Sequence, residues 1–427
     1  MNEPLTPHPV SSPYHSLVER LNRFPQGAPQ SKTLYEILKI LFSQQEADLV
    51  SRLPIKPFLA ETAAKNWKMS LPEARIILQK LAGRALLVDV ERDGQSIYTL
   101  PPPMAGFFEF SMMRYRSDVD QKRLGELFHQ YCNVEEDFIR SLFANGETQL
   151  GRVYIHEPVI PDAFVLDYER SSQVISSASA IGIGVCYCRH KMAIMNSACD
   201  APLDICMTFN SSAHSLIKHG FARKVDSVEG LDLLQQAYDS NLVQFGENTR
   251  QNVNFICNCC GCCCEALIAA RRFSPMRPIH TTNYQPVLDA DTCTGCGKCV
   301  NICPVEALGL VSANHYAEPN RKKAKLDETV CLGCGLCARI CPKESIQMQA
   351  RPQRVITPLN STHRVVMMAI ERGNLQNLIF DNQVLWSHRM LAAFLGAVLN
   401  LPPIQRTLAS KQVKSQYLET LIQRLSN

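Results

Sequence analysis

The spacing of apolar residues predicts a small helical region that begins near Lys32. One helical face, with the spacing i, i+3, i+4 and i+7, is formed by Leu34, Ile37, Leu38 and Leu41. A further helix is predicted to begin at Ser70 and to end at Gly83, because Ser70 and Glu73 have the spacing of a capping box. Its apolar face consists of Ala74, Ile77, Leu78 and Leu81.

A β-hairpin is predicted directly after this helix. Leu87–Glu91 and Ser96–Leu100 alternate between apolar and polar residues, and the residues between them include the turn pair Asp93-Gly94. Helices followed by a hairpin over residues 31–103 resemble a winged-helix domain. The resemblance implies DNA contacts from the last helix and the hairpin, at Arg75, Gln79, Lys80 and Arg92.

The charge balance of this region argues against DNA binding. Residues 31–100 contain ten Lys or Arg and eight Asp or Glu, a net charge of only +2. Three of the acids, Asp89, Glu91 and Asp93, lie in the hairpin, where phosphate would repel them. We therefore favour protein docking or dimerisation for this domain, with DNA binding as the alternative.

The composition is that of a folded protein with many cysteines. The chain has 427 residues, of which 46% are hydrophobic, and 19 cysteines; this length predicts about two to four domains. The first residues lack the charged and apolar regions of a secretory signal, so we expect a cytoplasmic protein whose thiols are reduced. No apolar run is long enough to span a bilayer, which argues against direct membrane insertion. The net charge of +4 does not indicate nucleic acid.

A cysteine motif occurs twice in residues 285–350, here called the repeat unit. Each copy has the spacing C-x2-C-x2-C-x3-C-P. The first copy comprises Cys293, Cys296, Cys299 and Cys303, and the second Cys331, Cys334, Cys337 and Cys341. This spacing is typical of chains that bind iron–sulfur clusters.

The repeat unit resembles bacterial-type ferredoxins with two [4Fe–4S] clusters. The resemblance implies that the first three cysteines of one copy share a cluster with the fourth cysteine of the other copy. One ligand set would be Cys293, Cys296, Cys299 and Cys341, and the other Cys331, Cys334, Cys337 and Cys303. Zinc is the alternative metal, but its sites rarely use three closely spaced cysteines followed by Cys-Pro.

A second cysteine-rich region is predicted over residues 181–284. Four of its cysteines are spread upstream and six are crowded together: Cys186, Cys188, Cys199 and Cys206, then Cys257, Cys259, Cys260, Cys262, Cys263 and Cys264. Thiols packed this densely would oxidise unless they bound something, so we predict metal ligands. An extended segment would place Cys257, Cys259 and Cys263 on one side and Cys260, Cys262 and Cys264 on the other. The upstream cysteines would then complete one or two sites.

All-sulfur ligation leaves iron–sulfur, zinc or copper(I) for this central region. We favour one or more additional iron–sulfur clusters, with zinc and a dithiol or disulfide as alternatives. Arg189 and His190 follow the first cysteine pair and are interpreted as a surface or hydrogen-bonded pair. The cysteine pattern as a whole, with the two ferredoxin motifs, resembles a group of multi-cysteine 4Fe–4S-binding proteins of anaerobic bacteria.

The remaining segments complete an α+β multidomain fold. Residues 1–30 contain six prolines and little periodicity, so we expect a flexible arm; residues 104–180 are predicted to form a helical connector that contains Cys132 as a buried thiol. The cysteine-rich region is predicted to be an α/β domain. Residues 351–427 are predicted to be helical, with one helix that ends before Gly373 and another over residues 410–425. We expect these helices to cover the cluster domain.

The sequence predicts an electron-transfer protein that relays single electrons through two [4Fe–4S] clusters and a further cysteine-ligated cluster. The expected partner is a flavoprotein or an iron–sulfur oxidoreductase, and the basic run Arg321, Lys322, Lys323 and Lys325 would steer an acidic partner. Two alternatives stay open: a redox-sensing winged-helix regulator, and a reductase whose catalytic centre is the central cysteine region. The sequence leans away from an enzyme, since no phosphate-binding loop or radical-SAM motif is present.

Overall fold

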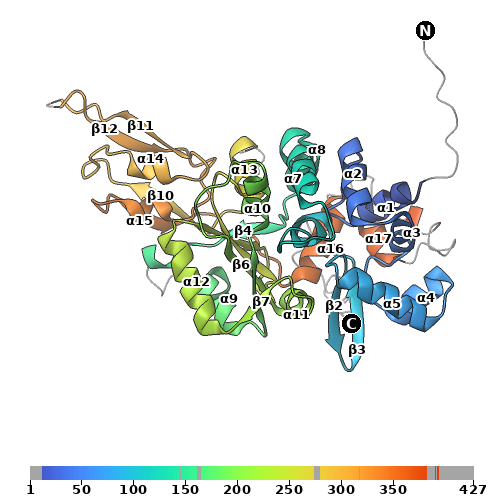
Figure 1. The fold of residues 1–427 in the computed structure, drawn as a ribbon. Coiled ribbons are helices and arrows are strands. Elements are labelled where there is room, and N and C mark those ends of the chain that lie inside the picture. The colour runs from blue at the N-terminus through green and yellow to red at the C-terminus, as the bar shows by residue number, and fades with distance from the viewer. Residues whose placement is uncertain are drawn as a thin grey trace, which may run out of the picture.

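The computed structural model describes residues 12–144, 146–160, 165–273, 279–316, 318–381, 390 and 392–393. Figure 1 shows an N-terminal helical part at one end, a sheet with helices in the middle, and the repeat unit projecting from the other end. Helices and sheets are mixed throughout, as expected for an α+β multidomain chain.

The N-terminal part contains five helices and a small antiparallel sheet. The helices are α1 (Pro13–Asn22), α2 (Lys32–Leu41), α3 (Gln44–Ser51), α4 (Ala60–Trp67) and α5 (Leu71–Ala82). The strands β1 (Phe58–Leu59), β2 (Val88–Arg92) and β3 (Gln95–Thr99) pair in the order β1-β3-β2. The predicted helix after Ser70 and the predicted hairpin are both confirmed, including the capping box between Ser70 and Glu73.

The flexible arm expected over residues 1–30 does not hold for α1. Pro13 stands at the start of this helix, where the missing N–H has no intrahelical partner to lose. Leu17, Val18 and Leu21 are buried in the main core, so the apolar face of the helix is fixed by packing. Residues 1–11 lie outside the described part of the chain.

The connector packs on the N-terminal helices through aromatic side chains. It contains η1 (Pro103–Phe107), α6 (Phe108–Phe110), α7 (Gln121–His129), η2 (Gln130–Val134) and α8 (Asp137–Ala144). The ring of Phe107 lies 5.9 Å from that of Phe42, which follows α2, and within the connector the ring of Phe108 lies 4.8 Å from that of Phe128 between centroids. Cys132 is 2% exposed in the same core, so its predicted burial is confirmed.

The central domain is built on a six-stranded sheet with the order β4-β8-β9-β6-β5-β7. Its strands are β4 (Gly151–Val153), β5 (Ile181–Val185), β6 (Asp204–Phe209), β7 (Arg223–Val225), β8 (Val243–Glu247) and β9 (Phe255–Cys259). Its helices are α9 (Ser171–Ser177), α10 (Tyr187–Ile194), α11 (Asn210–Lys218), α12 (Ser227–Asp239) and α13 (Glu265–Arg272), with short turns η3 (Glu157–Val159) and η5 (Asp167–Glu169).

Two expectations for this region are corrected by the sheet. Every strand pair in it is antiparallel, so the domain is α+β rather than α/β. The domain also begins before residue 181, because β4 pairs with β8 at the edge of the sheet. A strand of three residues carries too short a pattern to be recognised in the sequence.

The repeat unit consists of two strand pairs and two short helices. β10 (Tyr284–Leu288) pairs with β13 (Ile346–Ala350), and β11 (Leu308–Ser312) pairs with β12 (Lys322–Leu326), both antiparallel. The helices α14 (Lys298–Ile302) and α15 (Leu336–Ile340) each begin directly after the second glycine of a cysteine motif, Gly297 and Gly335. The internal sequence repeat therefore appears as a repeated loop and helix.

The C-terminal helices α16 (Ser361–Glu371) and α17 (Leu375–Ile379) do not cover the repeat unit. They pack on the N-terminal part, where Val366, Ala369 and Ile370 share a buried cluster with Ile55. Arg364 of α16 also forms a buried ion pair with Glu247 of β8 at 2.8 Å. The helix predicted over 410–425 lies outside the described residues. Within the described part of the chain, no helix is long and apolar enough to cross a membrane.

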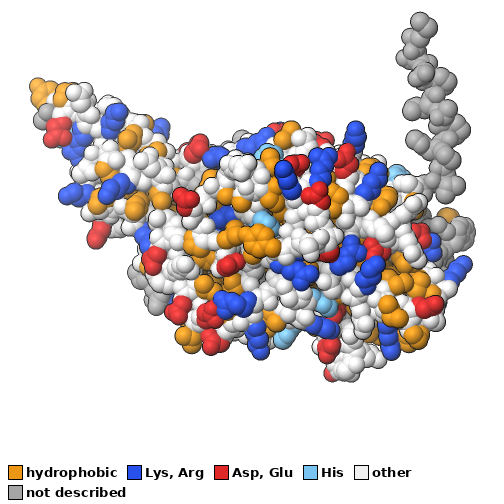
Figure 2. Space-filling model, in the orientation of Figure 1, with side chains coloured by type: hydrophobic (Ala, Val, Ile, Leu, Met, Phe, Trp, Pro, Cys, Tyr) orange, Lys and Arg blue, Asp and Glu red, His pale blue; other side chains and the backbone are white. Residues whose placement is uncertain are grey.

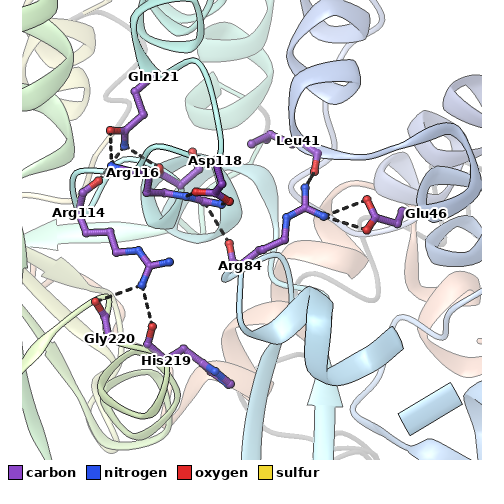
Figure 3. A network of polar contacts seen from close by, with 10 residues as sticks. Leu41, Glu46, Arg84, Arg114, Arg116, Asp118, Gln121, His219 and Gly220 are labelled. Atoms are coloured by element: carbon purple, nitrogen blue, oxygen red, sulfur yellow. Dashed lines mark hydrogen bonds and ion pairs between the residues drawn. The ribbon is translucent and has the colours of Figure 1, made fainter. Parts of the chain in front are cut away.

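A polar network ties the N-terminal part, the connector and the central domain together (Figure 3). Arg84 after α5 pairs with Glu46 at 2.8 Å, and its carbonyl oxygen accepts a hydrogen bond from Arg116 at 3.3 Å. Arg114 donates to the carbonyl oxygen of His219, after α11, at 3.0 Å. Three arginines thus hold three parts of the chain in one arrangement.

Candidate metal centres

The two cysteine motifs of the repeat unit meet as two groups of four thiols. One small pocket is lined by Cys293, Cys296, Cys299 and Cys341, which we call the distal site. A second pocket is lined by Cys303, Cys331, Cys334 and Cys337, which we call the proximal site. Each site therefore takes three cysteines from one copy and the fourth from the other, the exchange that the ferredoxin resemblance implies.

Backbone groups around both sites are arranged as a cluster requires. Main-chain N–H groups point at sulfur: Ala307 donates to Cys303 Sγ at 3.2 Å, and Gly333 donates to Cys331 Sγ at 3.4 Å. Gly333 has φ +71°, and a Cβ there would clash with the carbonyl oxygen of Tyr284. N–H bonds to sulfur stabilise negative charge on the ligands, and the glycine lets the loop approach its neighbour.

The comparison with protein families agrees with this geometry. The family model of the 4Fe-4S dicluster domain matches residues 292–345. The repeat unit is thus similar to domains that bind 4Fe–4S clusters, and its thiol sets and pockets fit two such groups. Searches among curated proteins and among solved structures found no match to the chain.

The distal and proximal sites differ in their exposure. Cys296 of the distal site is exposed, whereas Cys331 and Cys337 of the proximal site are buried. Burial raises the pKa of Cys334 to about 12, so the thiolate form of this residue depends on a bound cation. The proximal site faces the central domain, because the N–H of His156 donates to the carbonyl oxygen of Cys334 at 2.9 Å.

Six thiols of the central domain form a closed ring, here called the six-thiol ring. In order around it are Cys186, Cys188, Cys264, Cys259, Cys257 and Cys206, and the pKa of each thiol is shifted mainly by its two neighbours in this order. Four of them are at most 7% exposed. The ring brings together residues from β6 and β9, which are neighbours in the sheet, and from the starts of α10 and α13.

The ring is suited to hold thiolates. Hydrogen bonds from adjacent thiols lower the pKa of Cys186, Cys257 and Cys264, while the alternating members that donate these bonds have raised pKa values. Cys186 and Cys264 are also the N-caps of α10 and α13, where the helix dipole favours negative charge. Thiolates gathered around one space are the ligand form for soft metals.

Another four central cysteines form a tighter group, here called the four-thiol site. It consists of Cys199, Cys260, Cys262 and Cys263, whose Sγ atoms all lie within 4.8 Å of one another. The Sγ atom of Cys199 is 3.5 Å from that of Cys260 and 3.9 Å from that of Cys263. All ten central cysteines predicted as metal ligands therefore fall into two separate groups.

The predicted division of the crowded cysteines was right in number but wrong at two positions. Cys263 lies with Cys260 and Cys262, and Cys264 lies with Cys257 and Cys259. The predicted grouping holds through Cys262 and fails at Cys263 and Cys264, because β9 ends at Cys259 and a turn leads into α13. Past the strand, the direction of a side chain depends on the turn.

Arg189 and His190 are buried at 1% and 4% exposure, so a surface position is wrong for both, whereas the alternative of hydrogen-bonded residues is confirmed. Arg189 donates to the carbonyl oxygens of Pro202 at 2.9 Å and Asn258 at 2.7 Å. Burial alone would lower its pKa, but the nearby thiolates of Cys186 and Cys206 raise it. The guanidinium is therefore a fixed positive charge beside both thiol groups.

A cavity of about 1620 Å³ reaches the six-thiol ring. It is lined by ring cysteines, by the N-terminal part and by α16, and Glu109 projects into it from the connector. Desolvation, and then the negative charge of Cys257 and Cys264, raise the pKa of Glu109 well above its usual range. Sequence reasoning missed Glu109, because no motif marks an acid that lies far from the cysteines along the chain.

All four residues expected to contact DNA are exposed: Arg75, Gln79, Lys80 and Arg92. Two of them form surface ion pairs, Arg75 with Glu61 at 3.2 Å and Lys80 with Glu46 at 3.2 Å. In the hairpin, Asp89 is 4% exposed and accepts hydrogen bonds from the central helix α11 and the residue after it. The hairpin is thus attached to the protein through its acidic residues.

Proposed function

We propose that the protein is an iron–sulfur electron-transfer protein that connects a redox partner at the distal site with the six-thiol ring. The observation that carries this is the packing of the proximal site on the central domain. Cys331 and Leu332 of the repeat unit share one hydrophobic core with Cys259 and Cys264 of the central domain. Clusters bound at the distal and proximal sites would supply one-electron carriers in a line toward the ring.

The side chains around the three sites support a path of electrons between a partner at the distal site and the six-thiol ring. The distal site lies in the projecting part of the molecule, where Cys296 is open to solvent and to a partner. Figure 2 shows Lys and Arg side chains along this projection, which includes the basic strand β12. The proximal site and the ring are covered by packed side chains, which exclude water and lower the solvent exposure that sets cluster potentials.

The proposal is tested by iron counting and spectroscopy on anaerobically purified protein. We expect more than about eight irons per chain, with the excess lost in Cys206→Ser and kept in Cys132→Ala, which removes a buried thiol outside both central groups. EPR of the dithionite-reduced wild type should show the additional centre, and Cys206→Ser should keep only the signals of the repeat unit. About eight irons in the wild type, unchanged in Cys206→Ser, would contradict the proposal.

A second candidate function, a reductase, is favoured by the cavity and Glu109. The cavity is larger than most small-molecule sites, which are about 300–1000 Å³, and it reaches both the ring thiols and the carboxyl group of Glu109, whose pKa is raised by burial. A bound substrate could therefore receive electrons from the ring and a proton from Glu109 Oε. Carbon monoxide is a suitable probe, since a new infrared band in the reduced wild type would reveal an open iron position, and its absence would favour simple relay.

We further propose that the N-terminal part is a winged-helix-like domain used for docking. Its strand order β1-β3-β2 and the helices α3, α4 and α5 support this assignment. The ion pairs of Arg75 and Lys80 and the attachment of Asp89 favour an intramolecular role over DNA binding. Under this proposal, Arg75→Ala with Lys80→Ala leaves electron transfer unchanged and the wild type does not shift random duplex DNA at physiological salt. Salt-dependent binding lost in the double variant would support the regulator instead.

A further inference from the structure

The four-thiol site differs in size from the other cysteine groups. All of its ligand atoms lie within 4.8 Å of one another, and within the described part of the chain no other group of three or more potential metal ligands is this compact. The thiols of the distal site, the proximal site and the six-thiol ring do not meet this condition. A cubane places four irons and four sulfides between its thiolates, so its ligands must stand farther apart than ligands around one ion.

The distances in the four-thiol site match one tetrahedral ion. Sulfurs about 2.3 Å from a central zinc are about 3.8 Å apart at the edges of a regular tetrahedron. The measured Sγ separations are 3.5 Å for Cys199 and Cys260, 3.7 Å for Cys262 and Cys263, and 3.9 Å for Cys199 and Cys263. Four sulfurs at these separations leave no space for an iron–sulfur core.

We propose that Cys199, Cys260, Cys262 and Cys263 bind a single structural Zn²⁺, separate from the iron–sulfur centres. An all-thiolate tetrahedral site selects zinc or iron among common metals, and a given site binds Zn²⁺ more tightly than Fe²⁺. Copper(I) also binds thiolates, but a tetrahedral set of four sulfurs is typical of zinc or iron. Four protein ligands close the coordination sphere, which is the arrangement of structural rather than catalytic zinc.

The position of the site shows what the ion would do. Cys199 lies in the loop between α10 and β6, and the other three thiols lie in the turn between β9 and α13. Arg189 joins the same loop to the end of β9 through the carbonyl oxygens of Pro202 and Asn258, and its charge lowers the pKa of Cys260. The zinc would therefore fix the turn that directs Cys259 and Cys264 into the ring.

Metal analysis of anaerobically purified holoprotein tests the proposal independently of electron transfer. We expect about one zinc per chain, with X-ray absorption at the zinc edge showing four sulfur neighbours at about 2.3 Å. Cys199→Ser should lose most of the zinc while the irons of the repeat unit stay. Cys206→Ser should lose iron and keep zinc, so failure of the proposed electron relay and failure of the zinc site give different results.

A second variant tests the site even if Cys199→Ser does not fold. Cys262 is exposed, so Cys262→Ser disturbs packing least and should release zinc to a chelator at least about tenfold faster than the wild type. Cys132→Ala, at a buried thiol outside both groups, should release zinc at the wild-type rate. Wild-type protein without zinc, zinc with fewer than four sulfur neighbours, or an iron in place of zinc at this site would overturn the proposal.

Discussion

A Cβ atom on Gly261 would lie 2.5 Å from the carbonyl oxygen of Pro304. Gly261 stands within the turn that carries the four-thiol site, and Pro304 follows Cys303 of the proximal site. The contact therefore brings the turn of the central domain directly against a cluster-binding loop of the repeat unit. Only a residue without a side chain allows two backbone segments to approach this closely.

Gly261→Val should separate the repeat unit from the central domain. We expect a loss of about 1–3 kcal/mol in the free energy of unfolding, because the clash is with backbone and cannot be relieved by a side-chain rotation. Electron transfer from the repeat unit to a cluster bound at the six-thiol ring should also slow, as measured by rapid-freeze EPR. Gly309→Ala is the control, since a Cβ at Gly309 has no atom within 4 Å. Equal behaviour of the two variants would argue against a functional contact.

Asp89 attaches the hairpin to the central domain and can be tested with an isosteric change. Its carboxylate accepts from Lys218 at 2.8 Å, His219 at 2.8 Å and Ser215 at 2.9 Å. Asp89→Asn removes the charge, and we expect a loss of about 1–2 kcal/mol in urea unfolding, reduced by the partial exposure of Lys218. Asp93→Asn, at the tip of the same hairpin, should have no measurable effect. If Asp93→Asn lost as much free energy of unfolding as Asp89→Asn, the loss would come from the net charge of the hairpin and not from the contacts of Asp89.

The pH dependence of stability should include a contribution from His280. Burial, and then the charge of Arg152, lower the pKa of His280 to about 4, and its Nε2 accepts a hydrogen bond from the N–H of Gln149. In the unfolded chain the pKa of His280 is about 6.5, so between this pH and about pH 4 the histidine is protonated in the unfolded state and neutral in the folded state. The wild type should therefore lose about 2 kcal/mol of stability between pH 8 and pH 5 through this residue.

Comparison with His280→Gln isolates that contribution. The variant should show a flatter decline in the urea midpoint between pH 8 and pH 5, whereas His315→Gln, at an exposed histidine of the repeat unit, should follow the wild type. If all three proteins decline in parallel, then His280 is not neutral in the folded state.

Local signals in the sequence predicted local structure. Ser70 and Glu73 lie three residues apart and fix a helix start by themselves, and the spacing of the repeated cysteines marked the cluster-binding unit. These features depend on neighbours in the chain, so tertiary structure was not needed to recognise them.

Long-range relationships were not predictable in this way. The attachment of Asp89 to His219 spans 130 residues, and the same acid in the sequence indicated only repulsion from phosphate. The direction of Cys263 and Cys264 depended on where β9 ends, which no periodicity shows. The helix α1 was missed because prolines flank it, although it packs on α2 and α3 and its apolar face is buried in the main core. In each case tertiary packing selects one of several conformations that are equally compatible with the sequence pattern.

The charge of β12 gives a prediction about the distal site. Lys322 and Lys325 are exposed on this strand, and the strand lies beside Cys293, whose Sγ accepts from the N–H of Ala324 at 3.5 Å. A positive surface next to an electron-transfer site attracts anionic partners and raises their association rate by about 10–1000-fold at low ionic strength. Replacing both lysines by glutamate should therefore slow oxidation of the reduced protein by the anion ferric EDTA by at least about tenfold.

Two comparisons distinguish electrostatic attraction of the oxidant from a structural change at the distal site. Oxidation of the same double variant by the cation hexaammineruthenium(III) should become faster or stay unchanged, because the reversed charge now attracts the oxidant. Lys224→Glu, at an exposed lysine on β7 of the central domain, should leave both rates as in the wild type. The difference between the oxidants should shrink as salt rises, since the Debye length falls to about 3 Å at 1 M. A variant slowed equally toward both oxidants would instead mean that the lysines maintain the structure of the distal site.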